Sequence, residues 1–182
     1  MAEDRELTAP EYAALGLLAA EPQHGYELAR RWQAGPLAEV APTEQSVLYG
    51  YLRTLEGRGL LDWEEIRVGN RPPRRIFSAS ELGWEVLRPW LRSPVARMRE
   101  VRSDLLLKIY VLQLIDPDGE PRLLARQVAV CELYLQDAQA RLGEAEGFAR
   151  LVWESKETAA RATLTWLRSR LPDDGRIKKS AS

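Results

Sequence analysis

Cysteine and histidine are almost missing from this chain of 182 residues, which has one of each, Cys131 and His24. A single cysteine excludes a disulfide within the chain and a Cys-x-x-Cys metal or redox site. The sequence also lacks the HExxH, GxSxG, glycine-rich phosphate-loop and EF-hand patterns that indicate metal, acyl-transfer, nucleotide or calcium chemistry. We therefore expect a protein that is not an enzyme and that has no metal site and no cofactor.

Long hydrophobic runs and a surplus of basic charge are missing as well. No stretch of about 18 uncharged apolar residues occurs, and the acidic N-terminus lacks the apolar core of a signal peptide. We therefore expect a cytoplasmic protein without a membrane partner. The formal net charge is −1, whereas DNA-binding domains usually carry an excess of lysine and arginine. A nucleic-acid partner must therefore be judged from local charge.

The first half of the chain is predicted to consist of short elements, because turn residues and helix caps interrupt its apolar periodicity every 10 to 15 residues or so. Thr8 and Ser80 are candidate helix caps, and the segment 69–73 is rich in turn residues. The expected elements are helices near 8–21, 25–35, 43–58 and 80–92, and strands near 60–68 and 74–78.

The second half is predicted to be almost entirely helical, with one helix over 95–115 and two longer ones after the turn at Pro117-Asp-Gly119. The first long helix has an apolar seam in heptad spacing, formed by Leu124, Val128, Cys131, Leu135, Ala138 and Leu142. The last helix has two stripes. One consists of Phe148, Val152, Ser155, Ala159, Ala162 and Trp166, and the other of Ala160, Leu164, Leu167 and Leu171. Two stripes on one helix predict two neighbours, and Cys131 is expected to be a small buried hydrophobic residue.

Three short helices followed by a hairpin with a basic tip is the element order of a winged helix-turn-helix. The predicted fold is therefore mainly α-helical with a small β-hairpin wing, followed by a helical dimerisation region. We expect a DNA-binding domain over 1–92, a dimerisation domain over 95–171 and a disordered tail over 172–182.

The third predicted helix is amphipathic in a way that suits a DNA major groove. With Leu48 at 0° and about 100° per residue, Leu52 and Leu55 fall within about 40° of it and form the inner face. The opposite face has hydroxyls, an aromatic ring and an arginine but no acid, which favours contact with phosphates and bases. The predicted recognition residues are Thr43, Gln45, Ser46, Tyr49, Gly50 and Arg53.

The predicted hairpin supplies a second candidate contact, because the stretch 66–79 contains four arginines and no acid. Basic wing residues neutralise phosphates along the adjacent backbone or minor groove. The predicted wing contacts are Asn70, Arg71, Arg74 and Arg75. The alternative is a plain solvated turn whose charges protect an exposed strand edge from aggregation.

Several motifs occur in an order and spacing that resemble the PadR family of transcriptional regulators, over roughly 12–91. They are His24-Gly-Tyr-Glu-Leu28, Ser46-Val-Leu-Tyr49, Arg71-Pro-Pro-Arg-Arg-Ile-Phe77 and Leu82-Gly83. The second half, with Asp104-Leu-Leu-Leu-Lys108, resembles the virulence-activator-like helical region of the longer members. The resemblance implies a homodimeric DNA-binding regulator in which Tyr49 is the family's recognition-helix tyrosine. Gly50-Tyr51 departs from the family pattern, so the sequence preference does not carry over.

The resemblance also implies that some members respond to small aromatic compounds. Trp153 and Trp166 are candidates for such an effector pocket, although tryptophan on a helix seam more often serves packing. The predicted dimerisation residues are Leu105, Leu124, Val128, Leu135 and Trp166. We expect a dimeric regulator of double-stranded DNA, and a repressor rather than an activator, that reads an inverted repeat. The alternative is a winged-helix module that binds another protein without specific DNA binding.

Single residues beside the predicted recognition helix have simpler expected roles. His24 precedes a helix start and is expected to cap it or to form part of the turn. Tyr26 is expected in the core with its hydroxyl at the surface, and Tyr51 is expected to be packed rather than to contact bases.

Overall fold

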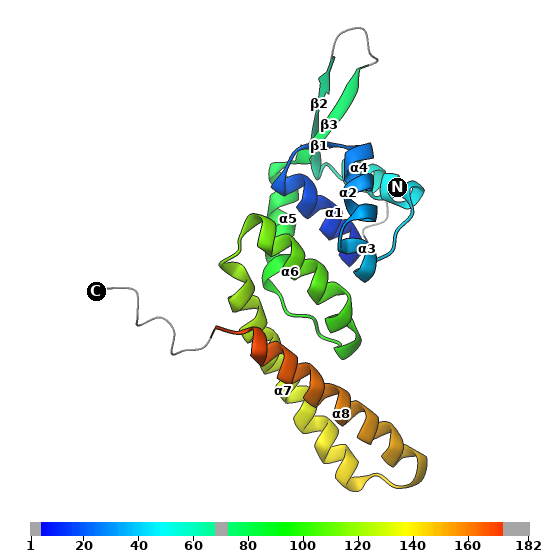
Figure 1. Cartoon of the computed structure of the whole chain (residues 1–182), viewed down its shortest axis with the longest axis vertical. Helices are drawn as coiled ribbons and strands as arrows, with labels where there is room; N and C mark the ends of the chain where they lie inside the picture. The colour runs from blue at the N-terminus through cyan, green and yellow to red at the C-terminus, as the bar shows by residue number, and fades with distance from the viewer. Residues whose placement is uncertain (1–4, 68–72, 173–182) are drawn as a thin grey trace, which may run out of the picture. The chain divides into compact units, whose positions relative to one another are not determined.

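The computed structural model describes residues 5–67 and 73–172 and is mainly helical with one small antiparallel sheet (Figure 1). Its elements are α1 (Ala9–Ala20), β1 (Gln23–His24), α2 (Gly25–Ala34), α3 (Leu37–Val40), α4 (Gln45–Gly57), β2 (Leu61–Ile66), β3 (Arg74–Ala79), α5 (Glu81–Arg92), the 3-10 helix η1 (Met98–Arg102), α6 (Asp104–Ile115), α7 (Gly119–Glu144) and α8 (Gly147–Arg170). No helix in the described ranges is long and apolar enough to cross a membrane.

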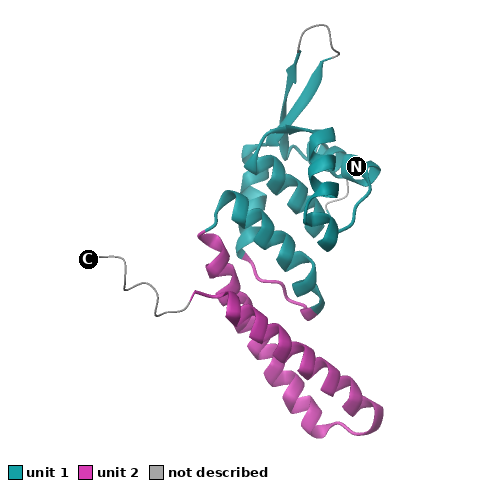
Figure 2. Ribbon diagram, in the orientation of Figure 1, with its two compact units in different colours: residues 1–92, 99–117 teal, residues 93–98, 118–182 magenta. Residues whose placement is uncertain are grey.

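The chain forms two compact units (Figure 2). The first contains residues up to 92 together with 99–117, and the second contains 93–98 together with the chain from 118 onward. The predicted fold class, a winged helix-turn-helix with additional C-terminal helices, is confirmed. The packing divides the chain differently from the boundary expected near 93, because α6 belongs to the first unit.

Helix α1 is the centre of the first unit, where it packs against α4, α5, α6 and β3. It begins at the predicted cap Thr8, whose backbone N–H and hydroxyl both donate to the Glu11 carboxylate, at 2.8 and 2.9 Å. Its alanines and leucines are buried around most of the helix, among them Leu15, Leu17 and Leu18. Such a helix, apolar on most of its circumference, is stable only when other elements cover it.

The predicted hairpin is confirmed, and the structure adds a third strand to it. The sheet order is β1-β3-β2, with Trp63 paired to Phe77 and Glu65 to Arg75 across β2 and β3. Strand β1 pairs with the same β3, His24 opposite Ile76. A two-residue strand is too short to show the alternation that predicts a strand, and the four-residue α3 is equally short. Both elements were therefore absent from the prediction.

The helix predicted over 95–115 was wrong at its start. The side-chain amide of Gln127 accepts a hydrogen bond from the Val95 N–H at 2.8 Å and donates to the Val95 carbonyl at 3.1 Å. These bonds satisfy the backbone of Val95 outside a helix, and regular helix begins only with η1 and α6. A bond between residues 32 positions apart leaves no trace in local periodicity.

Helix α6 packs against α1 and α5 in the first unit. The buried Lys108 ammonium donates to the Trp90 carbonyl at 2.6 Å and lies 4.6 Å from the centroid of the Trp90 ring. Burial lowers the pKa of Lys108 to about 8, although the Asp104 carboxylate acts in the opposite direction. The Tyr12 ring of α1 stacks on the same tryptophan, with centroids 4.8 Å apart.

The second unit consists mainly of the α7–α8 hairpin. The heptad seam of α7 is buried at Leu124, Cys131 and Ala138, and the stripe of α8 that contains Leu164 and Leu167 is buried as well. Cys131 is fully buried, as predicted, and burial raises the pKa of its thiol. The turn between the helices includes Gly147 at a φ of 55°, a conformation that glycine adopts without strain.

Helices α1 and α6 approach each other closely at Gly16, where an added Cβ would clash with Cγ1 of the buried Val111. We predict that Gly16→Ala lowers the free energy of unfolding by about 1–3 kcal/mol, because the methyl group overpacks this contact. Urea denaturation followed by circular dichroism measures the change.

Gly143→Ala is the matched control, because nothing lies within 4 Å of a Cβ at Gly143 in α7. Val111→Ala, added to Gly16→Ala, should restore part of the lost stability by making room for the methyl group. Equal stability of Gly16→Ala and the wild type would show that α6 does not pack this closely on α1.

Candidate nucleic-acid interface

Helix α4 has a buried face and an exposed face, as the helical wheel predicts. Leu48, Leu52 and Leu55 are at most 4 % exposed and anchor the helix to the first unit. On the opposite side Ser46 and Arg53 are exposed, and Tyr49 and Gly50 are half-buried. The predicted recognition face is therefore accessible in the chain. Its use in DNA binding stays a prediction.

Arg53 is a free cation within the part of the chain that the structure describes, since its guanidinium makes no ion pair or hydrogen bond there. An exposed arginine without a partner retains all five of its N–H donors for a phosphate or a guanine edge.

Tyr49 is held in place by a glycine on the neighbouring helix. A Cβ at Gly25, the first residue of α2, would lie 3.0 Å from Cε1 of Tyr49 and 3.0 Å from Cδ1 of Leu52. The missing side chain at Gly25 lets the tyrosine ring lie against the start of α2. The sequence shows this glycine beside His24, but no local pattern connects it to a tyrosine 24 residues later.

The start of the predicted recognition helix differs from the expectation. Helix α4 begins at Gln45, which is exposed, whereas Thr43 precedes it. The Thr43 hydroxyl donates to the Ala41 carbonyl at 2.8 Å, so this hydroxyl already has a partner in the loop. Tyr51 is half-buried as expected, and burial raises the pKa of its phenol.

The predicted wing contains both free and paired arginines. Asn70 and Arg71 lie outside the described residues. Arg75 donates to the Glu56 carboxylate at 3.1 Å and lies over the Trp63 ring, 4.1 Å from its centroid. Arg74 has no such ion pair or ring contact in the described ranges, and the residue opposite it on β2 is the apolar Ile66.

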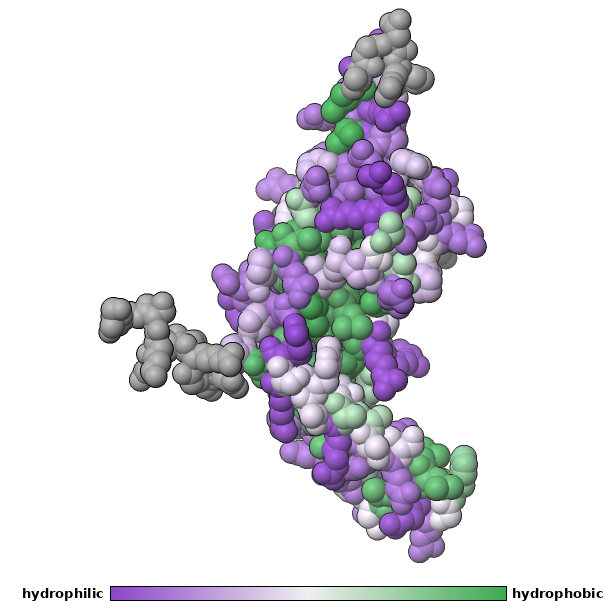
Figure 3. Space-filling view, viewed as in Figure 1, coloured by the Kyte–Doolittle hydropathy of each residue, from purple (hydrophilic) through white to green (hydrophobic). Residues whose placement is uncertain are grey.

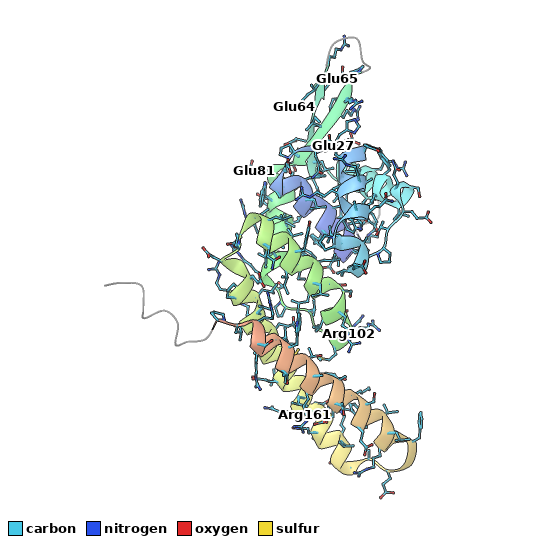
Figure 4. The ribbon with its side chains drawn as sticks, in the orientation of Figure 1. Glu27, Glu64, Glu65, Glu81, Arg102 and Arg161 are labelled. Atoms are coloured by element: carbon cyan, nitrogen blue, oxygen red, sulfur yellow. The ribbon has the colours of Figure 1, made fainter. Side chains whose placement is uncertain are left out.

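The wing is less basic than the acid-free stretch 66–79 indicates. Strand β2 brings Asp62, Glu64 and Glu65 into the same hairpin, and Figure 4 labels the last two on it. Glu65 is opposite Arg75 and lies 3.6 Å from the guanidinium of Arg67. Of the described wing arginines, Arg74 is therefore the one best suited to bind an outside anion.

The predicted dimerisation residues differ in how much surface they expose. Leu105 in the first unit and Leu124 in the second expose none in the single chain. Val128 and Leu135 are half-buried in the seam of α7, and the Trp166 side chain on α8 is 38 % exposed. A role in dimerisation stays a prediction for these residues, and Trp166 has the surface for a direct contact.

The two tryptophans of the predicted effector pocket lie on one helix. Thirteen residues separate Trp153 from Trp166, which corresponds to about 20 Å along α8. The Trp153 ring lies 4.1 Å from the ammonium of Lys156 and 5.1 Å from the guanidinium of Arg141. One chain cannot bring both rings to a single small molecule, so a pocket of this kind requires a second chain.

Comparison with known proteins places this geometry in context. The model of the transcriptional regulator PadR-like family matches residues 14–89. No curated protein matches the chain.

Among solved structures, PadR of Bacillus subtilis in complex with operator DNA is 20 % identical, with 89 % of this chain and 96 % of that chain covered and a TM-score of 0.47. The PadR-like transcriptional regulator BC1756 of Bacillus cereus is 17 % identical, with 92 % and 97 % covered and a TM-score of 0.45. PadR of Bacillus subtilis in complex with p-coumaric acid is 20 % identical, with 89 % and 96 % covered and a TM-score of 0.42. The residues of this chain that match the PadR-like family model, 14–89, include α4 and the hairpin.

Proposed function

We propose that this protein is a homodimeric transcriptional regulator that binds an inverted repeat in double-stranded DNA and represses the gene beside it. The observation that carries the proposal is the outward face of α4, where Arg53 is exposed and has no partner in the described ranges while the leucines opposite it are buried. The PadR-like domain over 14–89 supports the same function.

In this proposal α4 lies in the major groove. Arg53 donates to a guanine edge or a phosphate, and the hydroxyls of Ser46 and Tyr49 donate to phosphate oxygens. The wing lies along the neighbouring backbone, where Arg74 is the described residue with a free charge. Thr43 and Gln45 lie at the N-terminal end of α4, the end that reaches bases in helix-turn-helix proteins.

The outer face of α8 supports dimerisation. With Ala162 at 0° and about 100° per residue, the arc within about 60° on either side contains no charged residue. Every residue in this uncharged arc is exposed in the single chain. Its members are Gly147, Phe148, Leu151, Ser155, Thr158, Ala159, Ala162, Thr165, Trp166 and Ser169.

An exposed helix face normally carries charge, and α8 does carry arginine, lysine and glutamate on both flanks of this arc. Small residues such as Ala159 and Ala162 let another helix approach closely, and Phe148 and Leu151 are 79 % and 61 % exposed. Figure 3 shows hydrophobic side chains at the surface where α7 ends and α8 begins. We assign this arc to a second copy of the chain, because a two-fold interface requires one patch that fits itself.

A two-fold dimer would present two α4 helices to successive major-groove faces, about 34–36 Å apart. A bound dimer represses by covering the DNA that polymerase needs. A small aromatic effector would relieve repression only if it binds more tightly to a dimer in which this separation is wrong. Trp153 and Trp166 stay the candidates for its pocket, with each ring supplied by a different chain.

We predict that Arg53→Ala and Tyr49→Ala each weaken binding to the operator by about tenfold or more, because a good base or phosphate contact contributes about 1–3 kcal/mol. Both variants should remain dimers, since neither residue lies on α8. A mobility-shift titration with the DNA upstream of the gene measures affinity, and sedimentation measures the dimer.

Arg31→Ala is the matched control on the first unit, because this arginine belongs to α2 and is paired with Glu21 at 3.2 Å. Binding by the wild type should weaken steeply as salt rises, since phosphate contacts release counterions. Absence of wild-type binding at low salt would favour the alternative, a winged-helix module that docks on another protein.

We predict that Ala162→Arg converts the dimer to a monomer, because it places a charge at the centre of the uncharged arc. Sedimentation velocity at micromolar concentration measures the change, and affinity for a two-half-site operator should fall in parallel.

Ala149→Arg is the matched control, because Ala149 is exposed on the same helix but lies about 140° from Ala162, on the side that faces α7. This variant should remain dimeric. A dimer that survives Ala162→Arg would move the interface away from α8.

A further inference from the structure

A cavity of about 310 Å³ opens beside the wing in the first unit, and Arg74 is the one lining residue that belongs to the predicted DNA contacts. Its lining comes from the end of β1, the first turns of α2 and the start of β3, namely His24, Tyr26, Glu27, Arg30 and Arg74. It is large enough to admit a phosphodiester group together with bound water.

The two arginines of this cavity are both exposed, and neither forms an ion pair or hydrogen bond within the described ranges. Arg31, the next residue of α2, is instead paired with Glu21. The one acid in the lining, Glu27, is engaged at the helix start, where its carboxylate accepts from the His24 N–H at 3.3 Å. Two guanidinium groups face one carboxylate, which leaves the cavity with a positive excess.

His24 is a donor toward this cavity because of its hydrogen bond to the helix. Its Nδ1 accepts from the Tyr26 N–H at 3.2 Å, as the predicted cap requires. A neutral imidazole that accepts at Nδ1 carries its proton on Nε2, which is then free to donate. Helix α2 itself contributes little to anion binding here, since His24 already occupies the N–H of Tyr26.

Tyr26 was expected in the core, but its side chain is 57 % exposed at the cavity rim. Its neighbour Gly25 is buried instead, and it lies against Leu52 and the ring of Tyr49. Through Arg74 the cavity adjoins the wing.

We infer that this cavity binds one phosphate of the DNA backbone, in addition to the groove contacts of α4. Arg30 and Arg74 hold the phosphate from the two sides, and the imidazole of His24 and the hydroxyl of Tyr26 donate to its oxygens. The inference rests on the proposed function. The DNA backbone is the favoured source of the phosphate because Arg74 in the lining belongs to the hairpin, which lies along the DNA backbone in that proposal.

The test is the salt dependence of operator binding by Arg30→Gln in the full-length dimer. Each phosphate contact contributes about 0.9 to the slope of log K against log salt, so the slope should become shallower by about one for each bound subunit. At about 0.1 M salt this corresponds to an affinity lower by about eightfold for each subunit. Arg31→Gln, the same change one residue along the helix, should keep the wild-type slope.

A double-mutant cycle tests whether Arg30 and Arg74 share one phosphate. The effects of Arg30→Gln and Arg74→Gln should then be less than additive, whereas Arg30→Gln and Arg53→Ala should add. His24→Asn retains a helix cap but removes the Nε2 donor, and Tyr26→Phe removes only the hydroxyl. Each should weaken binding without lowering the melting temperature.

Three outcomes would overturn the inference while leaving the proposed function intact. In each, the wild type binds the operator and Arg53→Ala binds it weakly. In the first outcome, the salt slope of operator binding by Arg30→Gln equals that of the wild type. In the second, the effects of Arg30→Gln and Arg74→Gln on operator affinity are additive. In the third, calorimetry without DNA shows inorganic phosphate binding that depends on Arg30 while the operator slope stays constant, which indicates a site for a free anion. A wild type that does not bind DNA at all would instead reject the proposed function.

Discussion

The burial of one side of α4 is the constraint on which the rest depends. Leu48, Leu52 and Leu55 each gain about 1.5–3 kcal/mol from leaving water, which fixes the rotation of the helix about its axis. A turn of one residue, about 100°, would expose these leucines. Gly25 is the second constraint on the position of α4, because only a residue without a side chain lets α2 begin so close to Tyr49. Together these contacts decide which side chains of α4 face outward.

The distribution of charge matters more here than its sum. The chain has a net charge of −1, but its arginines fall into two classes. Arg31 and Arg75 neutralise glutamates of the same unit. Arg30, Arg53 and Arg74 have no such partner in the described ranges. A count of charges treats both classes alike, whereas only the second is available to phosphates without first breaking an ion pair.

Periodicity in the sequence was enough to predict the helices, the wing and the inner face of α4, because each depends on residues near one another in the chain. Periodicity did not predict features that depend on contacts between residues far apart in the chain. The Gln127 amide fixes Val95 outside a helix, and Val111 meets Gly16 across two helices. A heptad seam also does not specify its partner. The apolar seam of α7 is equally compatible with a contact between two chains. In the structure, however, residues of the seam such as Cys131 are buried within a single chain.

The two stripes of α8 show how one helix can contact two partners. The stripe that contains Leu164 and Leu167 packs against α7. The arc around Ala162 is exposed but uncharged, although exposed helix faces usually carry charged residues. If the arc around Ala162 pairs two chains, every DNA contact of the monomer is made twice, and the second half-site is bound at a high effective concentration. A domain with few free arginines then needs only modest affinity for each half-site. The lack of net basic charge in the chain and the uncharged face of α8 are then both compatible with binding as a pair.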